Sequence, residues 1–165
     1  MDNQETPTSF QAEKVDDFRI TAMLADYVSL KNGLLYVLGG GVGRVTVPHG
    51  TQAPYTVSNL GIGAIISVPW SKTLTEHTFS VRLVDEDAQS IFLPTGDGSV
   101  VPARADFPVM VSRPDEITPG MEQQYPLAIN FPNSTFPKLG VYVFLLLIND
   151  VEYDRVVMNV VELKQ

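Results

Sequence analysis

The stretch VYVFLLLINDVEYDRVVMNVV, residues 141–161, decides the fold class of this chain. Val141–Ile148 is apolar throughout, with the length of a strand and not of a membrane helix. Asn149-Asp150-Val151-Glu152 has turn chemistry, so we predict a hairpin from Tyr142–Ile148 to Arg155–Val161. The first of these strands is apolar on both faces. Both faces must therefore be covered, either by the chain's own loops or arm or by another protein.

Alternation of apolar and polar residues, the main signal of a half-buried strand, recurs along the rest of the chain. The alternating segments are Ile20–Leu24, Ile62–Val68, Phe79–Leu83 and Tyr125–Phe131. Asn32-Gly33 is a strong hairpin signal because both positions accept a positive φ, and Asp85-Glu86-Asp87-Ala88 separates two further strands. We predict eight to nine strands and no helix, arranged as a two-sheet antiparallel β-sandwich, with a barrel as the alternative.

The N-terminal residues differ in composition from the rest of the chain. Residues 1–17 carry five acids and one base, a net charge of −4, which is half of the chain's −8. Such a segment buries too little apolar surface to fold alone. We therefore expect residues 1–17 to be an acidic arm, flexible or clasping a neighbour, and residues 18–165 to be the β-sandwich domain. The arm has neither the basic start nor the apolar run of a signal peptide, so we expect a cytoplasmic or virion protein without a membrane partner.

The overall charge limits the class of partner. With a net charge of −8 and a pI of about 4.6, the chain repels phosphates, and its Lys and Arg residues are scattered singly, so we expect no binding to nucleic acid. Charged residues make up 18%, below the roughly 25% of average domains. A surface poor in charge leaves neutral or apolar area for a protein partner or for self-association. The absence of cysteine excludes disulfides and thiolate metal sites.

Several residue patterns resemble catalytic or ligand-binding motifs, but each favours a structural interpretation. Gly39-Gly40-Gly41-Val42-Gly43-Arg44 lacks the last glycine of a dinucleotide fingerprint and precedes a strand-like segment, so it indicates a close approach of the backbone. His49 and His77 form no zinc motif, and we interpret both as exposed loop residues. No serine lies in a nucleophile-elbow pattern. We therefore expect no catalytic, cofactor-binding or metal-binding residue and no cofactor.

Two features keep a second interpretation open. Asp85 and Asp87 could share a calcium ion with Asp150 or Asp154, since calcium takes oxygen ligands from loops. The same acids could instead serve the turns in which they lie, because aspartate favours turns. Trp70, at the end of the Ile62–Val68 strand, is either a half-buried plug or an exposed contact for a sugar or a protein.

Two segments taken together resemble a known family. They are Leu24-Ala25-Asp26-Tyr27 with the following Asn32–Gly41, and the loop Phe136-Pro137-Lys138-Leu139-Gly140-Val141-Tyr142. Their order is similar to that of small actinobacterial and bacteriophage proteins catalogued as a domain of unknown function, over most of residues 20–160. The resemblance implies an immunoglobulin-like β-sandwich, and because the family has no agreed catalytic residues, none can be carried over to this chain. In many immunoglobulin-like domains a tyrosine placed like Tyr142 bonds through its hydroxyl to the backbone and fixes a crossover between sheets.

These observations favour a non-catalytic module for protein–protein interaction or assembly. The acidic arm, the charge-poor surface and the two-faced apolar strand carry this expectation. A bacteriophage virion structural protein that decorates a capsid or tail is one form of it, suggested by the resemblance. The alternative is a ligand- or calcium-binding β-sandwich, supported by the loop acids and Trp70. An enzyme is the least supported class.

Overall fold

The computed structural model describes residues 17–94 and 99–164, so the expected arm at residues 1–16 lies outside the described residues. Within this part the chain forms fourteen strands and one short 3₁₀ turn, with no α-helix. There is accordingly no helical segment there with the length and hydropathy to cross a bilayer. The all-β prediction is confirmed. The strand number exceeds the eight to nine expected because the chain adds short ladders whose periodicity is too brief to recognise, among them β5 (Tyr55–Val57), β8 (Phe92–Pro94), β9 (Val100–Pro102) and β12 (Ser134–Phe136).

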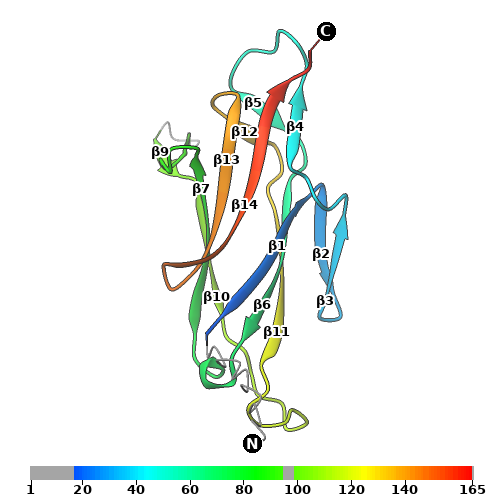
Figure 1. Cartoon of the computed structure of the whole chain (residues 1–165), viewed down its shortest axis with the longest axis vertical. Helices are drawn as coiled ribbons and strands as arrows, with labels where there is room; N and C mark the ends of the chain where they lie inside the picture. The colour runs from blue at the N-terminus through cyan, green and yellow to red at the C-terminus, as the bar shows by residue number, and fades with distance from the viewer. Residues whose placement is uncertain (1–16, 95–98, 165) are drawn as a thin grey trace, which may run out of the picture.

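The larger sheet has five strands in the order β10-β7-β13-β14-β4 (Figure 1). Its strands are β4 (Arg44–Val47), β7 (His77–Asp85), β10 (Arg104–Val109), β13 (Gly140–Ile148) and β14 (Val151–Glu162). Each pair is antiparallel except β14 and β4, which run parallel. The expected antiparallel arrangement is therefore wrong at this edge. β4 and β14 lie far apart in the sequence and no hairpin joins them, so the direction of their pairing is not forced to be antiparallel.

The second sheet has three antiparallel strands in the order β1-β6-β11. They are β1 (Arg19–Ala25), β6 (Gly61–Val68) and β11 (Gln123–Asn130). Three two-stranded ladders complete the described structure: β2 (Tyr27–Lys31) with β3 (Leu34–Leu38), β5 with β12, and β8 with β9. The chain thus has five hydrogen-bonded sheets where two were predicted. The β2–β3 hairpin projects beside the three-stranded sheet (Figure 1).

The core lies between the two larger sheets and follows the predicted alternation. In β6 the side chains of Ile62, Ala64, Ile66 and Val68 are all buried. Strand β7 buries Phe79, Val81 and Leu83 in the same way. All of them belong to one continuous apolar cluster that also takes in side chains of β1, β11, β13 and β14. The period of two therefore assigned the core faces of β6 and β7 correctly.

Strand β13, apolar on both faces, lies at the centre of the larger sheet between β7 and β14. Its core face consists of Tyr142, Phe144, Leu146 and Ile148, all at most 4% exposed. On the other face Leu147 is buried, whereas Val141, Val143 and Leu145 are only half-buried. The side-chain rows of the neighbouring strands thus cover this second face only in part.

The predicted turns are present and use the residues expected. Asn32 and Gly33 join β2 to β3 with φ of 52° and 72°. Asn149 and Asp150 join β13 to β14 with φ of 50° and 64°. Positive φ at both central residues is the geometry of the tight hairpin turn, which asparagine and glycine tolerate best. The second turn is two residues long and not four, because Val151 and Glu152 already pair in β14.

Tyr142 ties the start of β13 to the loop before it, as the resemblance implied. Its side chain is fully buried, and its hydroxyl donates to the carbonyl oxygen of Lys138 at 2.8 Å and accepts from the Lys138 N–H at 3.2 Å. The ring of Phe136 packs edge-on against it at 4.8 Å. The two bonds offset the cost of removing the hydroxyl from water, so the buried ring holds the loop to the sheet.

Replacing this hydroxyl tests the role. We expect Tyr142→Phe to lower the free energy of unfolding by about 1 kcal/mol, because the two bonds to Lys138 are lost while the ring still fills its site. Urea denaturation measures the change. Tyr27→Phe, which removes a hydroxyl from an exposed ring, is the matched control and should leave the midpoint unchanged. Equal midpoints for the two variants would contradict the role of Tyr142.

An aromatic cluster anchors the first strand of the described structure. Phe18 is 6% exposed and packs edge-on against His77 and Tyr153, with ring centroids at 4.8 and 5.7 Å. The Tyr153 hydroxyl donates to the Asp17 carboxylate at 2.8 Å, and Lys72 lies 3.4 Å from the same oxygen. The bond from Tyr153 lowers the pKa of Asp17. Burial, followed by the bond to Asp17, raises the pKa of Tyr153 to about 12.

This cluster gives the fold an alkaline dependence. Because the pKa of Tyr153 is raised from 10.0 to about 12 on folding, its contribution to stability is complete below pH 10 and is lost as the pH rises toward 12. We expect the free energy of unfolding to fall less steeply over this window in Tyr153→Phe than in the native chain. Urea titrations at a series of pH values measure both slopes. Parallel slopes would show that Tyr153 ionises equally in the folded and unfolded chains.

Candidate interaction surface

The β2–β3 hairpin carries large apolar side chains on both of its faces. A surface hairpin that packs on the protein with one face usually carries polar residues on the other. Its register pairs Val28 with Val37 and Leu30 with Leu35 on one face. The opposite face carries Tyr27, Leu34, Tyr36 and Leu38, together with Ser29 and Lys31. We call the four apolar residues of this second set the outward face. The two faces meet different surroundings, and the difference defines the candidate site.

The inner face of the hairpin rests on two glycines of β6. A Cβ atom at Gly63 would lie 3.2 Å from Val37 and 3.3 Å from Val28, and one at Gly61 would lie 3.1 Å from Val28. The glycines alternate in β6, so both lie on the side of the three-stranded sheet away from the core. Without side chains there, the hairpin approaches the sheet closely enough to bury Val28 completely.

Asn130 fixes the hairpin at a single point. Its side-chain oxygen accepts from the Val28 N–H at 3.0 Å, and its amide nitrogen donates to the Val28 carbonyl oxygen at 2.8 Å. The side-chain amide thus makes the two hydrogen bonds that the backbone of a neighbouring strand would otherwise make with Val28. Both backbone groups of a fully buried residue are satisfied by a partner 102 positions away in the sequence.

The glycine run after β3 returns the chain to the sheet, which confirms its structural interpretation. The N–H groups of Gly41 and Val42 both donate to the carbonyl oxygen of Leu24, at 2.8 and 3.1 Å. Gly39 has a φ of +64°, and a Cβ atom there would lie 2.3 Å from the Asp26 carboxylate. A residue with a side chain cannot take this place. The run leads into strand β4 and not into the helix that follows the glycines of a phosphate-binding loop.

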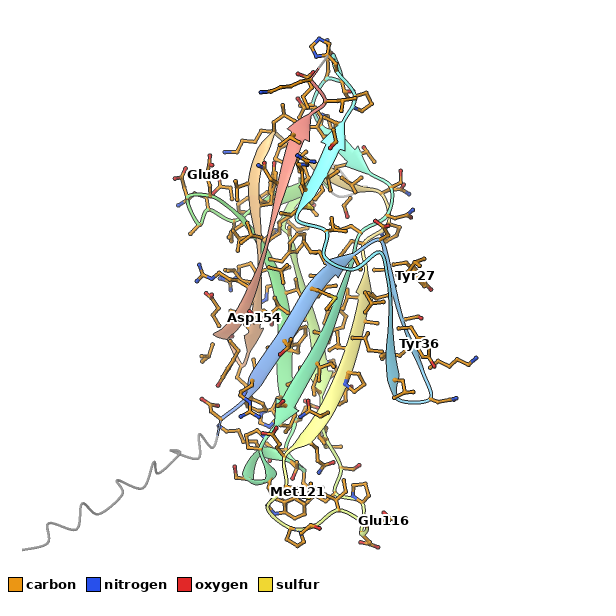
Figure 2. The ribbon with its side chains drawn as sticks, turned by 45° about the vertical axis from the view of Figure 1, so that its right-hand side comes forward. Tyr27, Tyr36, Glu86, Glu116, Met121 and Asp154 are labelled. Atoms are coloured by element: carbon orange, nitrogen blue, oxygen red, sulfur yellow. The ribbon has the colours of Figure 1, made fainter. Side chains whose placement is uncertain are left out.

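The outward face is exposed to solvent. Tyr27, Leu34, Tyr36 and Leu38 are 54%, 61%, 49% and 68% exposed. Figure 2 shows Tyr27 and Tyr36 on the side of the hairpin that points away from the body of the protein. Residues 27–43 contain a single charged residue, Lys31, in a chain with 19 acids. The hairpin is therefore an apolar, acid-free projection on an acidic protein.

An open groove of about 420 Å³ lies between the tip of the hairpin and the three-stranded sheet. Leu34, Leu35 and Tyr36 form its hairpin wall, while Ile65 and Pro126 line the sheet side. Ile65 is 40% exposed, so the apolar surface continues from the hairpin onto β6.

The two histidines lie in unrelated places and form no site. His49 is exposed, as predicted, and its Nδ1 lies 3.4 Å from Glu162. His77 is half-buried as the first residue of β7, which corrects its assignment as an exposed loop residue. Its Nε2 lies 2.8 Å from the carbonyl oxygen of Lys72 and its Nδ1 lies 3.1 Å from the Asn149 amide nitrogen. Contacts with Lys72 and Asn149 thus hold this histidine within the structure.

The loop acids serve the turns in which they lie. The Asp85 carboxylate accepts from the N–H groups of Gln89 and Asp87 at 2.9 and 3.0 Å, and the bond from Gln89 lowers its pKa most. In register Asp85 lies opposite Tyr142 and Asp154 opposite Leu146, which separates them by roughly 13 Å along β13. One calcium ion cannot bridge that distance. Among the residues that the structure describes, no three acids or histidines gather as a metal site.

Trp70 is half-buried at the end of β6, in agreement with its interpretation as a plug. The Arg113 guanidinium lies 4.3 Å from the centre of the Trp70 ring and donates to the Trp70 carbonyl oxygen.

A second apolar pocket, of about 210 Å³, lies beside the core and away from the hairpin. Phe131, Phe136 and Phe144 form part of its wall, and Arg104 lies at its polar side.

The exposed hairpin surface was not predicted from the sequence, although two local signals for it are present. Glycines at alternate positions 61 and 63 of a predicted strand indicate a close approach by another segment. The strand after Asn32-Gly33, Leu34–Leu38, is also apolar at every residue, so it presents apolar side chains on both of its faces and the hairpin alone cannot bury both. The role of Asn130 left no local signal, because its partner lies 102 residues away.

Comparisons with known proteins give a family and no activity. A family model described as a family of unknown function, DUF6941, matches residues 20–161. No curated protein matches the chain. Among solved structures, a crystal structure of a β-glucosidase from Listeria innocua in complex with isofagomine is similar with a TM-score of 0.39 and 8% identity. The match covers 88% of this chain and 16% of that one, and a similarity of this size supports no conclusion about fold or function.

The bond between Asn130 and Val28 predicts how the hairpin is held. We expect Asn130→Ala to lower the free energy of unfolding by about 1–3 kcal/mol, because it leaves two buried backbone groups of Val28 unpaired. Amide hydrogen exchange should accelerate at Val28 and its hairpin neighbours while β13 stays protected. Asn159→Ala in β14 is the matched control, with no comparable effect on the hairpin. Unchanged exchange at Val28 would show that Asn130 does not hold the hairpin.

Proposed function

The chain belongs to this family of unknown function, DUF6941, and we propose that it is a non-catalytic interaction module that docks on protein partners through its β2–β3 hairpin. The observation that carries the proposal is the outward face, with four large apolar side chains between 49% and 68% exposed. Single exposed apolar residues are common on proteins, but contiguous ones mark interaction surfaces. Here four of them share one face of one hairpin.

The hairpin is held in place before any partner arrives, which favours binding. Its inner face is packed on Gly61 and Gly63, and Asn130 bonds to Val28. A surface that is already ordered loses little conformational entropy on docking. Two tyrosines add to this, since tyrosine combines a large apolar ring with a polar tip and is enriched at interfaces.

Charge supports the same surface. The chain carries −8 overall, yet residues 27–43 contain Lys31 as their single charged residue. An acidic surface repels acidic partners, whereas a neutral projection can be desolvated at low cost. The hairpin is therefore the part of the described surface that another protein can cover most readily.

An immunoglobulin-like sandwich is the fold we propose as the scaffold of this module. In its support, the two larger sheets share one core, and the order β10-β7-β13-β14-β4 surrounds a central strand that begins with Tyr142. The bond from the Tyr142 hydroxyl to the Lys138 carbonyl oxygen resembles the tyrosine corner of such domains and supports this fold. Three short ladders decorate this scaffold, and the hairpin is one of them.

The setting we propose is an assembly, of which a capsid or tail decoration protein of a bacteriophage virion is one form. A decoration protein needs a rigid domain and a surface that seats it on its neighbours. We propose that the acidic residues 1–16 form a second contact with a neighbour. This contact would be charged, since the segment carries four acids and one base, whereas the hairpin is apolar and carries one base. The protein then acts in the cytoplasm or in the particle, with no membrane or nucleic-acid partner.

The alternative of a ligand-binding sandwich rests on the apolar space near Phe131, Phe136 and Phe144. Arg104, its charged lining residue, already donates to Asp106 and Asp150 at 2.7 and 2.8 Å. A ligand site orients its occupant through a few polar groups directed into the pocket. Because Arg104 is engaged elsewhere, we favour the interaction role.

Site-specific photocrosslinking in the source organism tests the proposed function. A benzophenone amino acid replaces Tyr36 on the outward face, and in a control chain it replaces Thr56, an exposed residue of β5. We expect illumination to join position 36 to another polypeptide chain, a second copy or a different protein, because the ring is buried in the complex. Denaturing gels and mass spectrometry identify the adduct.

The control decides the meaning of an adduct. Equal crosslinking from positions 36 and 56 would indicate random encounter and would overturn the proposal. So would the absence of any adduct at position 36 when the chain is expressed at its natural level. An adduct confined to position 36 supports the hairpin as the docking surface whatever the identity of the partner.

A further inference from the structure

We propose that the partner of the hairpin is a second copy of this chain, which pairs antiparallel with it along β3 about a two-fold axis through Tyr36. The inference rests on the proposed function, because it names the occupant of the same surface. The product is a four-stranded sheet in the order β2-β3-β3′-β2′, where the prime marks the second copy. Three observations support it: an unprotected edge, a self-complementary sequence and the distribution of charge.

The edge of β3 has backbone groups available for pairing. Within the described residues β3 has β2 as its strand neighbour on one side and no strand on the other. Val28 turns its N–H and C=O toward Asn130 and therefore away from β3. Since backbone direction alternates along a strand, the opposite residue Val37, and with it Leu35, turns its N–H and C=O to the free edge. These four groups match those of an antiparallel partner.

The composition of β3 differs from that of another edge strand of the described structure. The edge strand β10 carries Arg104, Asp106 and Pro108, which are residues that block pairing with further strands. β3 is Leu34-Leu35-Tyr36-Val37-Leu38, without charge or proline. Figure 1 shows β3 as the outer strand of the hairpin, on the side away from the three-stranded sheet. An apolar edge left without such protection is suited to strand addition.

The sequence of β3 is nearly symmetric about Tyr36. A two-fold axis there places Leu34 opposite Leu38′, Leu35 opposite Val37′ and Tyr36 opposite Tyr36′. Leu35 and Val37 then form hydrogen-bonded pairs with their counterparts, and Tyr36 forms a non-hydrogen-bonded pair with its own copy. Every cross-strand pair is apolar, and the central pair is aromatic, which is a favourable combination in antiparallel sheets. The same patch on both copies satisfies the requirement of a two-fold interface.

Charge restricts where two copies can meet. Each copy carries −8, so most approaches bring like charges together. Residues 27–43 hold one charge, that of Lys31, and the axis at Tyr36 keeps the two copies of Lys31 apart on the outer strands β2 and β2′.

Single cysteines test the register, because the native chain has none. We expect Tyr36→Cys to form a disulfide-linked dimer of twice 18.1 kDa under mild oxidation, since a non-hydrogen-bonded pair brings the two Cα atoms within disulfide range. Leu34→Cys and Leu38→Cys should each remain monomeric on a non-reducing gel. A mixture of these two variants should crosslink, because position 34 lies opposite position 38′. Crosslinking of all variants alike would overturn the register.

Light scattering over a concentration series tests association without oxidation. We expect the native chain to approach twice its monomer mass, and Tyr36→Lys to raise the dissociation constant at least tenfold by placing like charges opposite each other on the axis. Tyr27→Lys is the matched control: it makes the same change on the outward face, but in β2, and should weaken association far less. Equal weakening by the two variants would overturn pairing along β3.

The outcomes separate this inference from the proposed function. A native chain that stays monomeric at every concentration, with no disulfide from Tyr36→Cys, overturns the second copy as occupant. If position 36 still crosslinks to a different protein in the source organism, the hairpin remains a docking surface for that protein. If it crosslinks to nothing, both proposals fail together.

Discussion

Burial of one face of β13 is the constraint on which the rest of the structure depends. This strand lies between β7 and β14, and its side chains Tyr142, Phe144 and Leu146 reach the centre of the core. Each side chain of this size contributes about 1.5–3 kcal/mol when it is removed from water. The three-stranded sheet supplies the opposite wall of the core, so its inner face must alternate in the same way. The corner bond from Tyr142 to Lys138 then sets where the strand enters the sheet.

A second constraint follows on the far side of the three-stranded sheet. The chain covers this side with its own β2–β3 hairpin, which requires glycine at positions 61 and 63 and a bond from Asn130 to Val28. Covering one apolar face in this way creates another, because the hairpin carries large apolar residues on both sides. The outward face is thus a consequence of the hairpin's own composition. Exposed apolar side chains do not stabilise the single chain, so their presence on this face favours a role in binding a partner.

Much of the fold could be predicted from local pattern, and particular residues show where this ends. The alternation in Ile62–Val68 and Phe79–Leu83 predicted both strands and their core faces, and Asn32-Gly33 predicted its turn. Ladders of three residues escaped detection because so short a segment has no measurable period. His77 was assigned to an exposed loop, yet contacts with Lys72 and Asn149 draw it into the fold. The parallel pairing of β4 with β14 likewise depends on the path of the chain and not on the residues of either strand.

The all-β class, the positions of the long strands and turns, the acidic charge and the absence of thiols follow from local sequence and composition. Neighbouring residues and residue counts are enough to predict each of them. Which apolar residues remain exposed depends on the folded chain. Val28 and Tyr36 lie in the same hairpin, yet one is buried and the other is 49% exposed, because Gly61, Gly63 and Asn130 approach one face and not the other. Exposure depends on contacts between distant segments, and those exist only once the chain has folded.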